Sequence, residues 1–422
     1  MKIICVGGGP AGLYFAIRAK LRDARHRVTV LERDRPGTTH GWGVVYWEPL
    51  LDALFRYDPV SARGVQAAST LWRGQHVTLG GPRTAYLPGY GYSIQRAALL
   101  NVLAHRAVEL GVDVRYSHRV AGPDALAELA AGSDLVVAAD GANSQVRRTA
   151  DPDAFGTQLE QGTNRFVWLG TDRAFDTFVF AFERTKAGWI WFHAYPSAAD
   201  ISTCIVECAP DTWTGLGLDR LDVTAGCQLL ERIFAGPLGG HRLLADCQGR
   251  PARWQRFTHV VNCSWHHQNV VLLGDAAHTT HFTLGSGTAL AMLDAVMLDR
   301  FLHERRDVAT ALRDFDRAGR EALEPLQDRA RVSMAWFEGV DDRLNDAVPR
   351  AAWPSPVPPG PEAPAPDPLA FAYAMATRHG DETPLRYQLL RAAQRPTVRA
   401  LEARAGRGTR WLHEKGRALV AR

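Results

Sequence analysis

Short apolar runs, each followed by glycine or acidic residues, recur along the first two-thirds of the chain. Residues 2–6, 28–31, 134–139 and 269–273 have the length and composition of buried strands. The first run leads into a longer apolar stretch, residues 11–21, whose length favours a helix. Strands that alternate with helices in this way predict an α/β domain with a parallel sheet.

The pattern changes over residues 165–210. Here the runs 166–170, 177–184, 188–195 and 201–208 combine aromatic and β-branched residues with partial alternation and with Gly or Asp breaks. This pattern predicts an antiparallel sheet. Its aromatic side chains would give a flat aromatic ligand a wall to lie on.

The last part of the chain has a helical period up to about residue 344. Residues 353–368 then contain eight prolines in sixteen positions, which predicts a semi-rigid linker or an extended strap. Residues 369–422 carry eleven Arg or Lys and four Asp or Glu, so we expect a basic helical tail.

The glycines that follow the first strand form a nucleotide-binding fingerprint. The sequence is Gly7-x-Gly9-x-x-Gly12, with Pro10 and Ala11 between the last two glycines. Such glycines allow a tight turn and bring a pyrophosphate close to the N-terminus of the helix. The fingerprint is informative here because it lies between a predicted strand and a predicted helix.

A carboxylate ends the second strand. Glu32 lies 20 residues after Gly12, which suits a hydrogen bond to a ribose 2′-hydroxyl and disfavours a 2′-phosphate. Arg33, next to it, is included in the predicted cofactor site.

Two more fragments follow the later strands, at the sheet edge where open α/β sheets bind ligands. They comprise Asp140 and Gly141, then Gly274 and Asp275, and the second is followed by Gly285, Ser286, Gly287 and Thr288 at the start of a helix. Together with the fingerprint they predict an FAD site. Because we find no second fingerprint, NADPH or NADH is expected to bind only transiently as the electron donor.

Several segments resemble one branch of the single-component flavin hydroxylases, that of salicylyl-CoA 5-hydroxylase and 2-aminobenzoyl-CoA monooxygenase. The resemblance runs from residue 1 to about 340 and is carried by residues 41–47, 166–168, 193–196, 205–208, 278–291 and 333–338. It implies a Rossmann-type FAD-binding domain like that of para-hydroxybenzoate hydroxylase, an antiparallel β-sheet substrate domain and C-terminal helices.

The resemblance also implies roles for individual residues. We expect residues 93–99 to start a helix, and Gly43, Val44 and Arg96 to contact FAD. For removal of a proton from the substrate we look first at His193 and His281. The candidates for the substrate wall are Tyr46, Trp47 and Tyr195.

The implied activity is the hydroxylation of an activated aromatic ring with NAD(P)H and O2, through a C4a-hydroperoxyflavin. An aryl-CoA thioester such as salicylyl-CoA or 2-aminobenzoyl-CoA is the first candidate substrate. Two departures keep the substrate open, because that branch usually has Lys at the position of Ala289 and an acidic residue at that of Leu293.

Other functions stay possible at this point. They are hydroxylation of an indole-derived or carrier-bound aromatic, an FAD oxidoreductase that inserts no oxygen, and a flavin-bound partner protein. A flavin halogenase is disfavoured, because its chemistry needs a lysine after the first motif and no lysine lies between Lys20 and Lys186.

The composition adds limits. The chain has 422 residues, 46% of them apolar, and no run long enough to span a membrane, so we expect a cytoplasmic enzyme that binds neither membrane nor nucleic acid. Its six cysteines form no CxxC pair, which predicts buried free thiols and no metal site. Its net charge of +4 combines a tail of +7 with a body of about −3.

The expected domain boundaries follow from these patterns. We assign residues 1–75, 93–160 and 262–345 to the FAD-binding domain, 76–92 and 161–261 to the substrate domain, 346–368 to the proline-rich linker and 369–422 to the basic tail.

Overall fold

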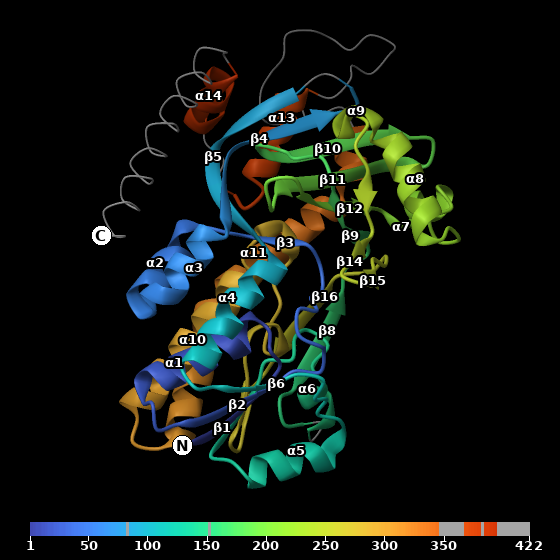
Figure 1. Cartoon of the computed structure of the whole chain (residues 1–422). Coiled ribbons are helices and arrows are strands. Elements are labelled where there is room, and N and C mark those ends of the chain that lie inside the picture. Colours follow the sequence, from blue (N-terminus) through green and yellow to red (C-terminus); the bar gives the residue numbers. More distant parts are fainter. Residues whose placement is uncertain (82–83, 151–152, 346–366, 381–383, 395–422) are drawn as a thin grey trace.

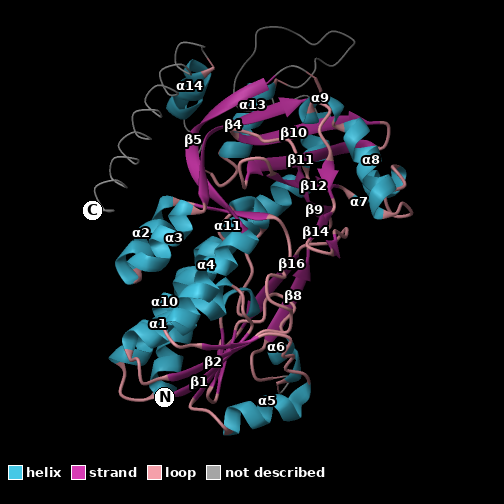
Figure 2. Ribbon diagram, viewed as in Figure 1, coloured by secondary structure: helices cyan, strands magenta, loops and turns pink. Residues whose placement is uncertain are grey.

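Two β-sheets organise the molecule, one in each half (Figures 1 and 2). The computed structural model describes residues 1–81, 84–150, 153–345, 367–380 and 384–394. The six-stranded sheet has the order β17-β18-β7-β1-β2-β6. Its strands are β1 (Lys2–Val6), β2 (Arg27–Leu31), β6 (Asp113–Arg115), β7 (Leu135–Ala138), β17 (His266–His267) and β18 (Val270–Leu272).

All strand pairs of this sheet are parallel except the pair of β17 with β18. Helices α1 (Pro10–Arg22), α4 (Arg96–Glu109) and α10 (Gly287–Glu304) pack on one side of it, and α5 (Gly122–Ala131) lies on the other (Figure 1). The apolar runs of the sequence therefore become strands covered by helices, as the α/β pattern requires.

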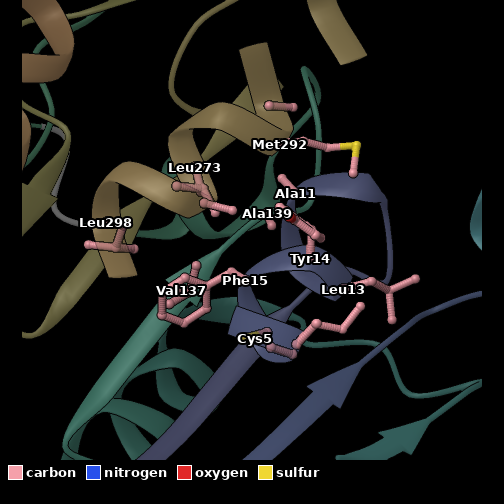
Figure 3. Packing of buried hydrophobic residues seen from close by; sticks show 14 of the residues in the cluster. Cys5, Ala11, Leu13, Tyr14, Phe15, Val137, Ala139, Leu273, Met292 and Leu298 are labelled. Carbon is pink, nitrogen blue, oxygen red and sulfur yellow. The ribbon is translucent and has the colours of Figure 1, made fainter. Parts of the chain in front are cut away.

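The packing of α1 explains the apolar character of the N-terminal segment. Figure 3 shows Phe15 of α1 close to Val137 of β7, with Met292 and Leu298 of α10 in the same cluster. Phe15 and Leu298 are fully buried. This core holds the first glycine turn at a fixed position over the strand ends.

The second sheet has eight strands in the order β13-β9-β12-β11-β10-β4-β5-β3. Their bounds are β3 (Gly43–Tyr46), β4 (Ser69–Leu79), β5 (Thr84–Gln95), β9 (Arg165–Thr171), β10 (Phe178–Thr185), β11 (Gly188–Pro196), β12 (Ser202–Cys208) and β13 (Leu243–Leu244). Its pairs are antiparallel except that β10 runs parallel to β4. That parallel pair joins two parts of the chain that are far apart in sequence.

The remaining elements cover these sheets or connect them. The helices are α2 (Glu48–Tyr57), α3 (Pro59–Ala67), α6 (Gln145–Thr149), α7 (Pro210–Gly215), α8 (Val223–Ile233), α9 (Ala235–Leu238), α11 (Val308–Glu338), α12 (Val340–Asn345), α13 (Pro368–Ala376) and α14 (Pro384–Ala393). Two short pairs of strands are β8 (Thr157–Gln161) with β16 (Thr258–Asn262) and β14 (Asp246–Cys247) with β15 (Arg250–Pro251). The 3-10 turns are η1 (Gly274–Ala276) and η2 (Phe282–Leu284).

The α/β class, the four parallel strands and the sheet over residues 165–210 are confirmed. One expectation is wrong: residues 93–95 do not start a helix, because β5 continues through Gln95 by pairing with β3, and α4 begins at Arg96. Residues 43–46 and 69–75, which we assigned to the FAD-binding domain, form strands of the eight-stranded sheet. The linker up to residue 366 and the tail from 395 lie outside the described residues.

The described cysteines are free thiols, as expected, although Cys263 is exposed. Within the described ranges no cluster of His, Cys, Asp or Glu has the composition of a metal site. None of the helices described here is long and apolar enough to cross a bilayer.

Candidate active site

A groove of about 370 Å³ opens at the carboxyl ends of β1, β2 and β7. The elements that meet there come from distant parts of the sequence, from the first turn to η1. Of the residues predicted to bind the cofactor, those that line the groove are Gly7, Gly9, Glu32, Arg33, Arg96, Asp140, Gly141 and Asp275. Pro10, Ala11, Gly12, Gly43, Val44 and Gly274 are buried and are not among the residues that line the groove.

Two glycines of the first turn cannot carry a side chain. Gly7 has φ +107°, and a Cβ on Gly12 would lie 2.1 Å from the Gly7 carbonyl oxygen. The close approach keeps the N-terminus of α1 against the strand ends, where its free N–H groups favour a phosphate.

The Glu32 carboxylate is held by two backbone amides. The N–H of Gly8 donates to Oε2 at 2.7 Å, and the N–H of Asp34 donates to Oε1 at 2.8 Å. These bonds fix the carboxylate at the rim of the groove. There it can accept a further hydrogen bond from a ribose hydroxyl.

Arg96, the first residue of α4, brings an unpaired cation into the groove. Its Nε is inaccessible to water and has no hydrogen-bond partner among the residues that the structure describes. Burial lowers the pKa of Arg96, while the nearby Asp275 and Glu32 carboxylates oppose that shift. A desolvated guanidinium without a partner is suited to a phosphate oxygen.

Asp140 has both a structural and an open side. Its Oδ2 accepts from the N–H of Gln145 at 2.6 Å and from that of Val146 at 3.2 Å, which caps α6. Its Oδ1 is buried and has no hydrogen-bond partner within the described ranges. The open oxygen lies where a hydroxyl of the cofactor would satisfy it.

The turn before α10 connects the groove to the second sheet. A Cβ on Gly287 would lie 4.0 Å from Oδ1 of Asp275, and one on Gly285 would lie 2.6 Å from the Val45 side chain and 3.9 Å from Nε1 of Trp47. Gly285, Ser286, Gly287 and Thr288 are outside the lining of the groove itself. They lie between it and β3.

An aromatic face covers that region of the eight-stranded sheet. The ring of Phe178 stacks on those of Tyr195 and Phe180, with centroid distances of 5.4 Å and 5.0 Å. The ring of His193 stacks on that of Phe282 in η2, with a centroid distance of 5.6 Å. The register of β10, β11 and β12 points these alternate side chains to the same side. The sheet thus presents aromatic rings, as expected for a wall against a flat ligand.

The two candidate histidines are neutral. Burial lowers the pKa of His193 to about 3, and no described residue forms a hydrogen bond with its Nδ1. Burial also lowers the pKa of His281 to about 3, helped by His193, Arg378 and His259. Their ring contacts with Phe282 bring both histidines to one site.

The three wall candidates are not together. The Tyr195 hydroxyl donates to the Gly43 carbonyl at 2.9 Å, and Trp47 meets the edge of Trp72, so both belong to the cluster around Phe178. Tyr46 instead bonds Ser69 at 2.6 Å and is only 1% exposed. Its role as a wall residue stays a prediction that its position does not favour.

Three polar residues near His281 were not among the predicted site residues, although Thr283 and Ser333 lie in segments that carry the resemblance. Thr283, Ser333 and Arg378 connect His281 to α11 and to the end of α13 through hydrogen bonds. No sequence signal points to Arg378, because the proline-rich segment separates it from the motifs and only the tertiary fold brings it to them.

Comparison with known proteins adds the family. The chain is 38% identical over 348 residues to a salicyloyl-CoA 5-hydroxylase from Streptomyces sp., covering 80% of this chain and 65% of that protein's length. It is 37% identical over 343 residues to a 3-hydroxy-4-methyl-anthranilyl-[aryl-carrier protein] 5-monooxygenase from Streptosporangium sibiricum, covering 81% of this chain and 90% of that protein. No family model matches.

The fold has solved counterparts. The tetrameric form of 2-methyl-3-hydroxypyridine-5-carboxylic acid oxygenase superposes with a TM-score of 0.61 at 19% identity, covering 81% of this chain and 91% of that one. The strand-turn-helix groove, the aromatic face and these relatives together define the class. The chain belongs to the FAD-dependent aromatic monooxygenases.

FAD fits the residues present. Three features suit a dinucleotide. The glycines of the first turn leave a space that a Cβ would fill, and Nε of Arg96 and Oδ1 of Asp140 have no partner among the described residues. Glu32 would hold the ribose, and the N-terminus of α1 would hold the pyrophosphate.

Proposed function

We propose that this protein is an NAD(P)H- and O2-dependent monooxygenase that hydroxylates the activated aromatic ring of an aryl-CoA thioester. When bound, FAD would take electrons from NAD(P)H and activate O2, which amino-acid side chains do not do. The protein itself binds, orients and shields the reactants.

The observation that carries the proposal is the continuity between the cofactor groove and the aromatic face. Asp275 in the groove adjoins Gly287, and Gly285 on the same turn adjoins Val45 and Trp47. Trp47 and Val45 belong to the cluster of Phe178 and Tyr195. A flavin that entered from the groove would therefore meet aromatic side chains on which a substrate ring can stack.

The residues of this face also exclude water. Tyr195 and His193 are each only 3% exposed, so little water reaches this part of the face. A dry site protects a reactive oxygen species from decay and strengthens each hydrogen bond to the substrate. His193 and His281 supply ring nitrogens in this dry region, and we propose that they contact the polar substituent of the ring.

A second candidate substrate is the same kind of aryl thioester on a carrier protein. It is favoured by the relative named for an aryl-carrier substrate, 90% of whose length this chain covers. The two substrates share the aryl thioester and differ in what carries it.

The test measures NADPH and NADH oxidation by the FAD-loaded protein, with products identified by mass. Salicylyl-CoA and 2-aminobenzoyl-CoA are compared with the free acids and with the same aryl groups on a carrier protein. Faster oxidation and hydroxylated product with the CoA thioesters alone support the first substrate; product only from the loaded carrier supports the second.

Labelled oxygen separates this function from an oxidoreductase that inserts no oxygen. In ¹⁸O2 the product of a monooxygenase gains one labelled atom. Turnover of the thioester with no label in the product would show that the proposed function is wrong.

A further inference from the structure

An unbroken chain of hydrogen bonds runs from the end of α13 to a ring nitrogen of His281. Nε of Arg378 lies 2.8 Å from Oγ of Ser333. Oγ of Ser333 lies 2.7 Å from Oγ1 of Thr283, which lies 2.8 Å from Nδ1 of His281. Each link has the length of a normal hydrogen bond.

The guanidinium fixes the direction of this chain. Arg can only donate, so Ser333 accepts from Arg378. The Ser333 hydroxyl proton then has Oγ1 of Thr283 as its acceptor. The Thr283 proton, in turn, is donated to Nδ1 of His281.

The reverse direction fails on proton accounting. If Nδ1 of His281 donated to Thr283, Thr283 would donate to Ser333, which already accepts from Arg378. The Ser333 proton would then have no acceptor among the described residues, although Ser333 is 0% exposed. A buried hydroxyl proton without a partner is unfavourable.

We infer that Arg378, acting through Ser333 and Thr283, holds His281 in the tautomer with the proton on Nε2, so that His281 is a hydrogen-bond donor to the substrate and not its base. The substrate half of this inference rests on the proposed function. The group that Nε2–H would recognise is an acceptor oxygen, either the thioester carbonyl or an ionised ring hydroxyl.

The surroundings of His281 agree with a neutral donor. The ring is 3% exposed, and its centroid lies 4.8 Å from the ring centroid of Phe257 and 4.2 Å from that of Phe282. Its neutral form is favoured because burial lowers its pKa. Nε2 has no hydrogen bond to any residue in the described ranges, so it is free to meet a ligand.

Arg378 is built into its position. Its Nη1 donates to the Met375 carbonyl at 2.6 Å, its Nη2 donates to the Thr283 carbonyl at 3.3 Å, and its guanidinium lies 5.7 Å from the Phe337 ring centroid. It forms no ion pair with a described carboxylate. Arg378 is therefore a positioning residue, which acts on His281 through the hydrogen bonds that its guanidinium donates.

The first test reads the tautomer directly. FAD-loaded protein with ¹⁵N-labelled histidine is observed by long-range ¹H–¹⁵N NMR, and the His281 signals are assigned by their loss in His281→Gln. We expect an unprotonated Nδ1 and a protonated Nε2. A proton on Nδ1 in the wild type would overturn the inference.

Variants then trace the cause. Arg378→Met removes the donor, and Thr283→Val interrupts the chain with a side chain of equal size, so both should mix the two tautomers. Arg378→Lys keeps a donor and should restore the wild-type signal. Arg343→Met is the matched control, because Arg343 also lies over an aromatic ring, that of Trp336, without a link to His281.

Kinetics test the donor role. His281→Gln keeps a donor and should retain at least about a tenth of kcat, whereas His281→Leu should lose about 100-fold, the scale of a removed catalytic hydrogen bond. Equal losses in both variants would overturn the donor role. If the tautomer is as stated but no thioester is hydroxylated, the proposed function is wrong and the inference about the His281 tautomer is kept.

Discussion

At the scale of single residues, ligand binding in the groove depends on glycines, which leave space for the ligand, and on polar atoms that no described residue pairs with. Gly12 is needed because the Gly7 carbonyl occupies the place of its Cβ, and Arg96 and Asp140 keep one polar atom each for a ligand. Sequence motifs predicted Gly12 and Asp140, because spacing in the chain reflects the local turn, and the resemblance to the flavin hydroxylases predicted Arg96. The hydrogen bonds that join Thr283 and Ser333 to Arg378 could not be predicted, since only the tertiary fold brings the three residues together.

Gly12→Ala should impair both folding and FAD binding. The new methyl group would lie 2.1 Å from the Gly7 oxygen, and relieving such overpacking costs about 1–3 kcal/mol. We expect purified protein with less flavin absorbance and a lower unfolding midpoint in urea. Gly226→Ala in α8 is the control, because a Cβ there meets nothing within 4 Å; equal losses in the two variants would contradict the steric explanation.

Glu207 on β12 should make stability depend on pH. It is 1% exposed, and its Oε1 accepts a hydrogen bond from Asn164 at 2.8 Å. Burial raises its pKa from 4.5 to about 8, so the unfolded chain ionises this carboxyl at lower pH than the folded chain. Its contribution to stability is therefore complete below about pH 4.5 and is lost as the pH rises to about 8.

Urea unfolding at about pH 5.5 and about pH 7.5 measures this effect, which amounts to roughly 2–3 kcal/mol at 1.4 kcal/mol per pH unit. Glu207→Gln should remove that part of the pH dependence, and the exposed Glu160→Gln should keep it. An unchanged slope in Glu207→Gln would show that the buried carboxyl is not its source.

At the scale of elements, periodicity predicted the central strands because one or both of their faces are buried. Residues 93–95 were misassigned because the apolar pattern that continues into α4 does not reveal where pairing with β3 ends. The packing of α13 against the rest of the molecule could not be predicted from the sequence either. Its apolar side chains Phe371 and Met375 enter a core of β10, β11 and α11 residues, and no pattern in α13 itself names those partners.

Phe371→Ala should detach α13. Phe371 is 3% exposed and meets Phe182 edge-on at 4.9 Å and Trp336 at 5.3 Å, and such a truncation costs about 3–5 kcal/mol. Hydrogen exchange of α13 amides should rise, and turnover should fall because Arg378 moves with the helix. Leu389→Ala in α14, at a side chain 61% exposed, should change neither quantity.

At the scale of the whole molecule, the site is assembled from segments between the first glycine turn and the end of α13. The class and the two-sheet architecture could be predicted because the motifs fix the ends of the parallel strands. The mixed direction of the second sheet could not, since the pairing of β4 with β10 depends on a contact between distant segments.

Removal of FAD should destabilise the folded chain. A ligand that binds only the native state adds about 2.7 kcal/mol when its free concentration is 100 times its Kd. We expect the thermal midpoint of the apoprotein to rise with added FAD and to respond less to AMP, which occupies only part of the groove. A midpoint that FAD does not raise would contradict the assignment of the groove.

The place of Arg378 in the sequence also orders events during protein synthesis. The ribosome releases the groove residues first, and each domain folds as it emerges. A nascent chain can therefore acquire a nucleotide site before the residue that orients His281 has been made. By our inference, translation itself delays the completed active site until the cofactor domain is already folded.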